Sequence, residues 1–118
     1  MGHEEREMIP NEKEWSKSEK EIARQAYKAA YNRECKAILE DVRKMAAETR
    51  DSTGLWKIHN YLTKKRKETD EKYDYRYSVL RFVFARLICE GWMHQEDIKG
   101  ISEDKLQEIR EAAEFYAG

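Results

Sequence analysis

The sequence predicts an all-α fold with a long N-terminal helix and a compact helical head. Glu, Lys, Ala and Arg dominate the 118 residues, whereas Val is scarce, a bias that favours helix over strand. Charged residues make up 40% of the chain but nearly cancel to a net charge of -1, and aromatic residues make up 11%. Disordered chains have few aromatic residues and a large net charge, so we expect the charges to cover helix surfaces. A single domain is expected over residues 15–118, after a flexible tail over residues 1–14.

The first helix is predicted to begin at Ser16 and to continue without a breaker as far as Asp51. Ser16 and Glu19 have the spacing of a capping box, in which a hydroxyl and a glutamate satisfy free backbone N–H groups. Apolar residues then recur at steps of three and four and form a seam close to a heptad pattern. The seam residues assigned to a dimer interface are Tyr31, Cys35, Ile38, Val42 and Met45.

The length of this helix predicts a homodimer. About 33 residues form a rod of about 50 Å, whereas a compact domain of this size has a radius of gyration near ~13 Å. The rod therefore extends beyond its own domain, and its apolar seam needs a cover. A second copy of the chain supplies that cover. The alternative is that the later helices fold back along the whole seam.

A second helix is predicted to follow a cap at Ser52 or Thr53. Its expected core stripe consists of Leu55, Ile58, Leu62 and Thr69. His59 and Arg66 lie beside this stripe, and Trp56 flanks it on the same side. Amphipathic side chains often occupy the margin of a core in this way. However, Trp, Arg and His at the edge of a stripe are also typical of an interface hot spot.

The most apolar segment, residues 73–92, predicts a third helix with Gly91 as its C′ residue. Its expected inward face consists of Tyr77, Leu80, Phe84, Leu87 and Ile88. Phe82 falls off this face and either packs against the first helix or stays exposed for a partner. A turn or short helix is expected over residues 93–100, and Ser102 is expected to cap a last helix. The apolar residues of that helix are Leu106, Ile109, Ala113 and Phe115.

The composition excludes several classes of protein. No run approaches the ~20 apolar residues of a membrane span, so we expect no direct membrane insertion. The first ten residues are acidic and lack the apolar segment of a signal peptide, which predicts a cytoplasmic protein. Cys35 and Cys89 are far apart in the sequence and fit reduced thiols better than a disulfide framework.

No motif predicts catalysis or a cofactor. The three histidines have no spacing with the cysteines that would form a zinc site, so we expect neither a metal nor another cofactor. The sequence contains no P-loop, dinucleotide fingerprint or nucleophile elbow. The basic run from Lys64 to Lys67 is the one candidate for nucleic-acid binding, but near-zero net charge favours a solvated helix face. These features favour a binding or regulatory protein.

One segment, residues 55–92, carries a distinctive pattern. Trp56 is followed three residues later by His59, then by Asn60 and Arg66, and a turn rich in Tyr and Asp leads to the sequence FVFA. This pattern resembles the fluorescence recovery protein family of cyanobacteria, and a looser likeness extends from residue 15 to residue 113. Trp56, His59 and Arg66 match characteristic positions of the family. Asn60 stands where the family usually has Asp.

The resemblance implies an all-helical homodimer that binds no pigment of its own. Members of the family bind the photoactivated orange carotenoid protein, speed its return to the resting orange form and help it leave the phycobilisome. By this resemblance Trp56, His59, Asn60 and Arg66 belong to the functional surface, and Phe82 contacts the carotenoid protein. The implied location is the cytoplasm, including the cytoplasmic face of thylakoid membranes, which the chain would reach through its partner.

Two other functions stay open at this point. Asn60 and the acidic N-terminal residues depart from the family pattern, which favours a diverged helical adaptor that acts on a different protein. A weaker alternative is a small helical subunit of an enzyme.

Overall fold

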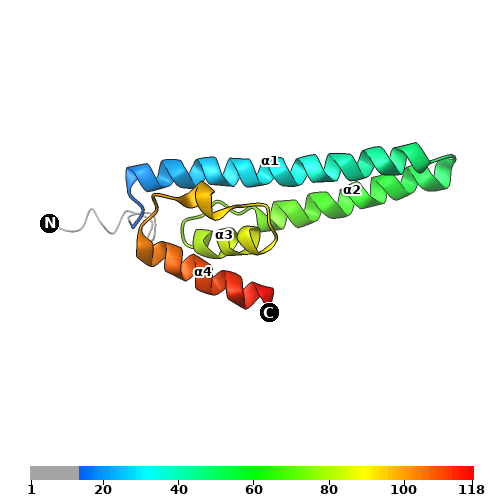
Figure 1. Ribbon diagram of the computed structural model, residues 1–118. Helices are drawn as coiled ribbons and strands as arrows, with labels where there is room; N and C mark the ends of the chain where they lie inside the picture. The colour runs from blue at the N-terminus through cyan, green and yellow to red at the C-terminus, as the bar shows by residue number, and fades with distance from the viewer. Residues whose placement is uncertain (1–13) are drawn as a thin grey trace.

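The computed structural model describes residues 14–118, which form four α-helices and one short 3-10 helix (Figure 1). The elements are α1 (Lys17–Glu48), α2 (Ser52–Lys72), α3 (Leu80–Cys89), η2 (Gln95–Ile98) and α4 (Glu103–Ala117). The only β-type pairing among the described residues is an isolated bridge between Lys99 and Ile101. The predicted fold class, all-α with a long N-terminal helix and a helical head, is confirmed. The tail predicted over residues 1–14 lies, except for Glu14, outside the described residues.

The helices form two regions that differ in how they are packed. The outer parts of α1 and α2 run antiparallel as a two-helix hairpin that projects away from the rest of the chain (Figure 1). We call this hairpin, residues 35–71, the arm. The remaining described residues, 14–34 and 72–118, form the head, in which α3 and α4 pack beside the first half of α1. At ~1.5 Å per residue, the 32 residues of α1 are about 48 Å long, so α1 extends through both regions.

The beginning of α1 is fixed by the predicted capping box. The Ser16 hydroxyl accepts a hydrogen bond from the Glu19 N–H at 3.1 Å, and the Ser16 N–H donates to the Glu19 carboxylate at 2.9 Å. Glu19 also accepts from the Ser102 N–H at 2.7 Å and from Lys105 Nζ at 3.3 Å. Burial raises the pKa of Glu19, but these backbone and side-chain hydrogen bonds outweigh it and lower the pKa to about 2. One carboxylate thus joins the beginnings of α1 and α4.

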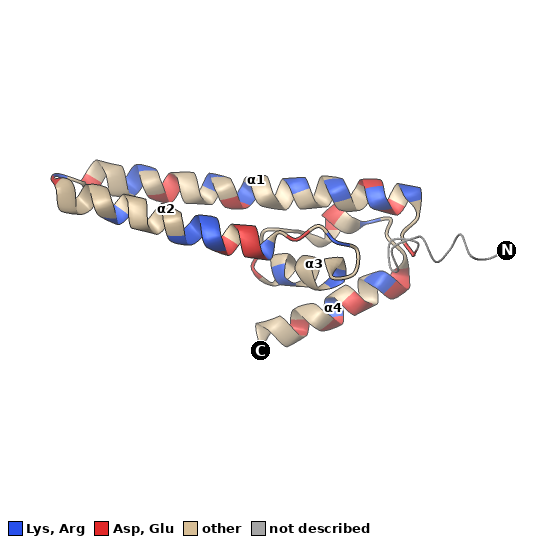
Figure 2. Cartoon of the chain, turned by 180° about the vertical axis from the view of Figure 1, so that it is seen from behind, with Lys and Arg blue, Asp and Glu red and all other residues tan. Residues whose placement is uncertain are grey.

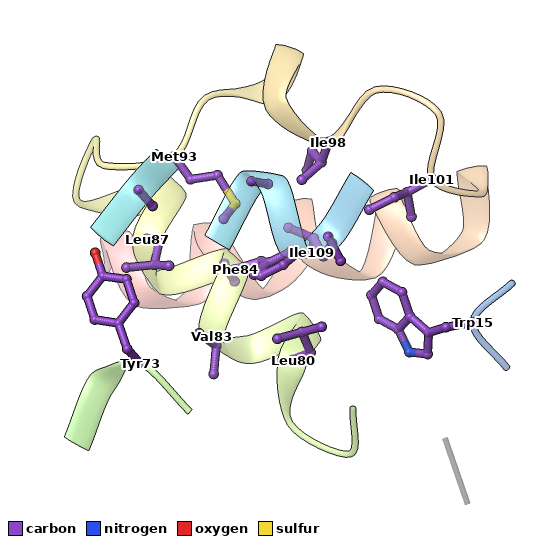
Figure 3. Close-up of a cluster of buried hydrophobic side chains, with 14 residues drawn as sticks. Trp15, Tyr73, Leu80, Val83, Phe84, Leu87, Met93, Ile98, Ile101 and Ile109 are labelled. Carbon is purple, nitrogen blue, oxygen red and sulfur yellow. The ribbon is translucent and has the colours of Figure 1, made fainter. Parts of the chain in front are cut away.

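The core lies in the head, between α1, α3, α4 and the segment around η2 (Figure 3). The buried apolar residues are Trp15, Ala23, Ala26, Ala30, Tyr73, Leu80, Val83, Phe84, Ala85, Leu87, Met93, Ile98, Ile101 and Ile109. On the helical part of α1 these are all alanines, which allow the other elements to approach its backbone closely. The buried positions of α3 confirm most of its predicted inward face. Of the apolar residues predicted on α4, Ile109 is buried, whereas Phe115 is 83% exposed.

The end of α3 shows the predicted role of Gly91. Its φ is 88°, a left-handed conformation that only glycine adopts without strain. The Trp92 N–H donates to the Leu87 carbonyl at 2.9 Å, and the Gly91 N–H donates to the Ile88 carbonyl at 3.0 Å. This pair of bonds is the Schellman motif, which terminates the helix and turns the chain toward η2.

Two helix boundaries differ from the predictions. The N-cap of α2 is Asp51, whose carboxylate accepts from the Gly54 N–H at 3.1 Å, and Ser52 is already helical. Asp is as good an N-cap as Ser, so the cap lies one residue earlier than expected. The third helix begins only at Leu80, and residues 73–79 are not α-helical.

Residues 73–79, which we call the strap, hold the head against α1 through tyrosines. Tyr27 on α1 donates a hydrogen bond to the Tyr73 carbonyl at 2.8 Å, and its ring meets the Tyr75 ring edge-on with centroids 4.8 Å apart. Arg24 lies over the Tyr75 ring at 4.9 Å. These aromatic and cation–π contacts fix a non-helical segment, with a turn at its end, where the sequence pattern predicted helix.

Candidate functional site

The structure separates the predicted site residues into two places. Trp56, His59, Asn60 and Arg66 lie on α2 in the arm, whereas Phe82 lies on α3 in the head. All five side chains are exposed. The chain therefore offers two candidate surfaces rather than one site, and a partner that used both would span the arm and the head.

The arm surface on α2 is an apolar stripe that no other described element covers. Leu55 and Leu62 of this stripe lie on one side of α2, and His59 and Arg66 lie beside them on the same side. Leu55 is 52% and Leu62 is 42% exposed, so assigning them to the core of a single chain was wrong. The physical reason is that the arm has only two helices, and α2 turns the side with Ile58, Tyr61 and Lys65 toward α1.

Trp56 and His59 form a pair at the edge of this stripe. Their rings meet edge-on with centroids 5.8 Å apart, and Trp56 is 57% exposed. A large aromatic ring this exposed is unusual on a surface that faces only water, and it is enriched at protein interfaces. The sequence placed these two residues correctly beside the stripe.

The apolar seam of α1 runs along the same arm as the α2 stripe. Tyr31, at the border of the head, and Asp70, which pairs with Arg66, line one small hollow between α1 and α2. Tyr31 and Leu39 are exposed, and the seam residues Cys35, Ile38, Val42 and Met45 are half-buried. The seam of α1 and the stripe of α2 together form what we call the arm face.

Arg66 is weakly held at the edge of the arm face. Its Nε donates to Asp70 at 3.1 Å along the same helix, and both side chains are exposed. Such a surface pair is worth at most ~1 kcal/mol, so a partner can compete for the guanidinium. The spacing of four residues was visible in the sequence, but the sequence reasoning missed Asp70. Asn60 is six positions from Arg66 and lies on another side of α2, as expected.

The basic run of α2 is partly neutralised by its own helix. Figure 2 shows the basic residues of α2 gathered toward the end that meets the head. Lys65 pairs with Glu68 at 3.6 Å, and Arg66 pairs with Asp70. These local pairs agree with a solvated helix face.

Phe82 borders a hollow between α3 and α4 in the head. Phe82 is 55% exposed, so of the two predicted alternatives the exposed position is the one observed. The hollow has a volume of about 690 Å³. Its aromatic and acidic lining residues are Phe82, Phe115, Tyr116, Glu14, Glu108 and Glu111. The sequence-based prediction named Phe115 only among the apolar residues of the last helix, so it did not connect α4 with Phe82.

A buried ionic cluster fixes the junction between arm and head. Lys72 Nζ donates to Glu34 at 2.7 Å and to Glu90 at 2.6 Å, and the Tyr73 hydroxyl donates to Glu34 at 2.8 Å. Arg86 donates to the other oxygen of Glu90 at 2.9 Å. Burial acts to raise the pKa of Glu90, but its bonds to Lys72 and Arg86 lower it overall. The cluster joins α1, α2 and α3, and it was not predicted because its members are distant in sequence.

Residues 14–118 contain neither a metal site nor a membrane-spanning helix. No group of three or more His, Cys, Asp or Glu side chains in this range is arranged to hold a metal ion. No helix in the described part of the chain combines the length and apolar character needed to cross a bilayer.

Comparison with known proteins identifies the family. Residues 15–113 match the family model described as photoprotection regulator fluorescence recovery protein. The chain belongs to this family. It is 38% identical over 99 residues to the fluorescence recovery protein of Synechocystis sp., an alignment that covers 84% of this chain and 91% of the relative.

Solved structures of the family share the fold. The fluorescence recovery protein of Fremyella diplosiphon is 46% identical, with a TM-score of 0.79 over 85% of this chain and 98% of that one. The structure from Synechocystis sp. PCC 6803 is 38% identical, with a TM-score of 0.80 and the same coverage. The resemblance seen in residues 55–92 is thereby confirmed, and the chain is a regulator of photoprotection by family.

Proposed function

We propose that this chain binds the photoactivated orange carotenoid protein, speeds its return to the resting orange form and promotes its release from the phycobilisome. The observation that carries the proposal is the pattern of Trp56, His59 and Arg66 on the exposed arm face, within the residues that match the family. No covalent bond changes in this function, so the chain acts as a regulator and not as an enzyme.

The proposed mechanism is differential binding. A protein that binds the compact arrangement of two domains more tightly than the separated arrangement lowers the free energy of the compact one. If it binds the transition state between them most tightly, it also lowers the barrier. The carotenoid protein then returns faster to its resting form, and excitation quenching ends.

The proposal includes a homodimer formed through the arm face. Tyr31, Cys35, Ile38, Val42 and Met45 would meet the same face of a second copy, together with the exposed leucines of α2. Two antiparallel arms packed in this way complete a four-helix bundle, in which the apolar side of each arm is covered. A symmetric pairing would also bring two copies of Arg66 to one interface and hold two heads at a fixed separation.

The proposed roles divide between the two regions. Trp56, His59 and Arg66 belong to the functional surface supported by the dimer, with Asn60 on a neighbouring side of α2. Phe82 on the head contacts the carotenoid protein. We place the chain in the cytoplasm, including the cytoplasmic face of thylakoid membranes, where its partner would bring it.

One observation favours a second candidate function. Asn60 is exposed and carries no charge where the family usually has Asp. A contact that depends on that carboxylate would be weaker here, which favours a diverged adaptor for a different protein partner. The two candidates differ in whether the carotenoid protein responds to this chain.

The deciding experiment is to mix the chain with photoactivated orange carotenoid protein and to time the red-to-orange return in the dark. The proposed function expects the rate to rise with the concentration of the chain and to reach a plateau. A return rate that does not depend on the chain would contradict the proposal and favour the adaptor.

A further inference from the structure

We propose that the hollow between α3 and α4 is a docking groove for a basic, amphipathic segment of a partner protein. Apolar side chains of that segment would lie against Phe82, Phe115 and Tyr116, and its Lys or Arg residues would face the acidic rim. The inference deepens the proposed function, and it rests on that function only in taking the Phe82 side of the head as a partner surface.

The floor of the groove is aromatic and open to water. Phe115 and Tyr116 meet edge-on with centroids 6.3 Å apart on the last turn of α4. Tyr116 and Phe82 also line a second hollow of about 190 Å³ on the other side of Phe82, so the surface continues past that ring. Clustered exposed aromatic side chains favour contact with another protein, because they bury a large area with few rotatable bonds.

The rim of the groove is acidic, and its one cation is already engaged. Glu14, Glu108 and Glu111 line the groove against the single guanidinium of Arg81. Arg81 donates to Glu14 at 2.8 Å, pairs with Glu108 through Nε and lies over the ring of Trp15. Two carboxylates thus share one guanidinium, while Glu111 is met only by the uncharged amide of Gln107. The excess negative charge selects a positively charged ligand.

The rest of α4 strengthens this selection. Acidic residues recur along the helix (Figure 2), with five of them against two basic residues. Lys105 is buried on Glu19, and Arg110 donates to Glu103 at 2.6 Å. Neither cation is therefore directed to the groove, and the field there stays negative.

The shape favours a protein segment over the other occupants. A volume of about 690 Å³ would suit a small molecule, but the 83% exposure of Phe115 shows that the groove is open along one side, as in helix-in-groove recognition. Residues 1–13 precede Glu14 but contain four Glu against one Arg and one Lys, so their charge disfavours them as the occupant. The basic run of α2 in a second copy is also disfavoured as the occupant, because its Lys65 and Arg66 are already paired within α2.

The probe for this groove is a labelled peptide of about twelve residues made only of Leu and Lys in helical spacing. A matched peptide has Glu in place of every Lys. Fluorescence anisotropy of each peptide with the full chain is expected to show binding of the basic peptide at least about tenfold tighter than the acidic one. The affinity of the basic peptide should fall as salt rises, because screening weakens the contribution of the rim.

Two variants locate the binding. Phe115→Gln and Glu111→Lys change exposed side chains, so the fold is retained, and each is expected to weaken the basic peptide about tenfold. Glu48→Lys makes the same change of charge at the far end of the arm and should leave the affinity unaltered. Equal binding of the two peptides, or no effect of Phe115→Gln, would overturn the proposal. Tighter binding after Met8 and Ile9 are replaced by Ser would also overturn it, because the chain itself would then be the occupant.

The peptide measurement is independent of the proposed function, because no carotenoid protein is present. If the basic peptide binds as expected but the chain does not affect the red-to-orange return, the proposed docking groove is supported and the proposed function is contradicted. If Phe115→Gln and Glu111→Lys no longer bind the peptide but still speed the red-to-orange return as the wild type does, the groove is not the surface used in that return. The proposed function would then be unaffected.

Discussion

The arm and the head of this chain solve the burial of apolar side chains in opposite ways. In the head, four elements enclose Phe84, Leu87 and Ile109, none of which is accessible to water. In the arm, two helices meet along one side only and leave leucines and Trp56 exposed. A pair of helices has too little surface to cover both of its apolar sides. The head therefore buries its apolar side chains within one chain, whereas the arm leaves an apolar face open, which we propose a second copy covers.

The largest effect is expected where arm and head join. Lys72→Met removes the one cation between Glu34 and Glu90 and leaves two carboxylates buried or half-buried without it. Removing one partner of a buried ion pair costs ~3–5 kcal/mol, so the free energy of unfolding should fall by about that amount in urea titrations. Lys67→Met, an exposed change on the same helix, is the control. Equal stability of the two variants would show that the cluster does not hold the head to the arm.

A smaller effect on stability is expected from Glu19, inside the head. Its pKa of about 2 lies below the ordinary value of 4.5, so it contributes about 3 kcal/mol at neutral pH. Because the pKa is lowered on folding, this contribution is present above pH ~4.5 and is lost as the pH falls toward ~2. The stability difference between wild type and Glu19→Gln should therefore shrink over that range. A difference that is independent of pH, or as small as that of the exposed control Glu21→Gln, would be inconsistent with this role.

On the arm face, Arg66→Leu is expected to alter function without altering the fold. Leu and Arg have similar helix propensities, so far-UV circular dichroism should hardly change. The guanidinium and its fork of donors disappear, and with them any bidentate pairing to a partner. Acceleration of the red-to-orange return should be lost. Lys64→Leu, on another side of α2, is the matched control and should keep it. If Arg66→Leu speeds the red-to-orange return as much as the wild type does, Arg66 has no role in the function.

The smallest effect is expected from Asn60→Asp. A charge-assisted hydrogen bond exceeds a neutral one by about 1 kcal/mol at a partly buried site, which is a several-fold change in affinity. Binding to the carotenoid protein should tighten by that factor, and the gain should shrink at high salt. Both forms would be compared in binding and in dimer dissociation at two ionic strengths. If Asn60→Asp weakens both the binding to the carotenoid protein and the dimer, the residues around position 60 are adapted to an amide. That result would favour the adaptor function.

The sequence predicted features that depend on local chemistry. The capping box of Ser16 and the glycine end of α3 use neighbouring residues, so spacing alone revealed them. The stripe on α2 was found by periodicity, but its burial was not, because periodicity identifies an apolar side without saying whether its own chain covers it. The cap at Asp51 was missed because three adjacent residues there are all good caps.

Features that depend on tertiary structure were not predicted. The strap is not helical because Tyr27 and Arg24 of α1 contact its tyrosines, whereas nothing within residues 73–79 breaks a helix. The Lys72 cluster joins residues that are 18 and 38 positions apart. Each of these outcomes was decided by a neighbouring element and not by the local sequence.

The most direct test of the difference between arm and head is the mass of the particle in solution. By light scattering at low micromolar concentration, we expect the wild type to have twice the 14.2 kDa of one chain. Replacing Ile38 and Val42 together by Glu places two unpaired charges in the arm face, each costing several kcal/mol if buried. The double variant should have the mass of one chain and keep the far-UV circular dichroism of a folded helical protein. A wild type with the mass of one chain, or a double variant that stays dimeric, would contradict the assignment of the arm face as the interface.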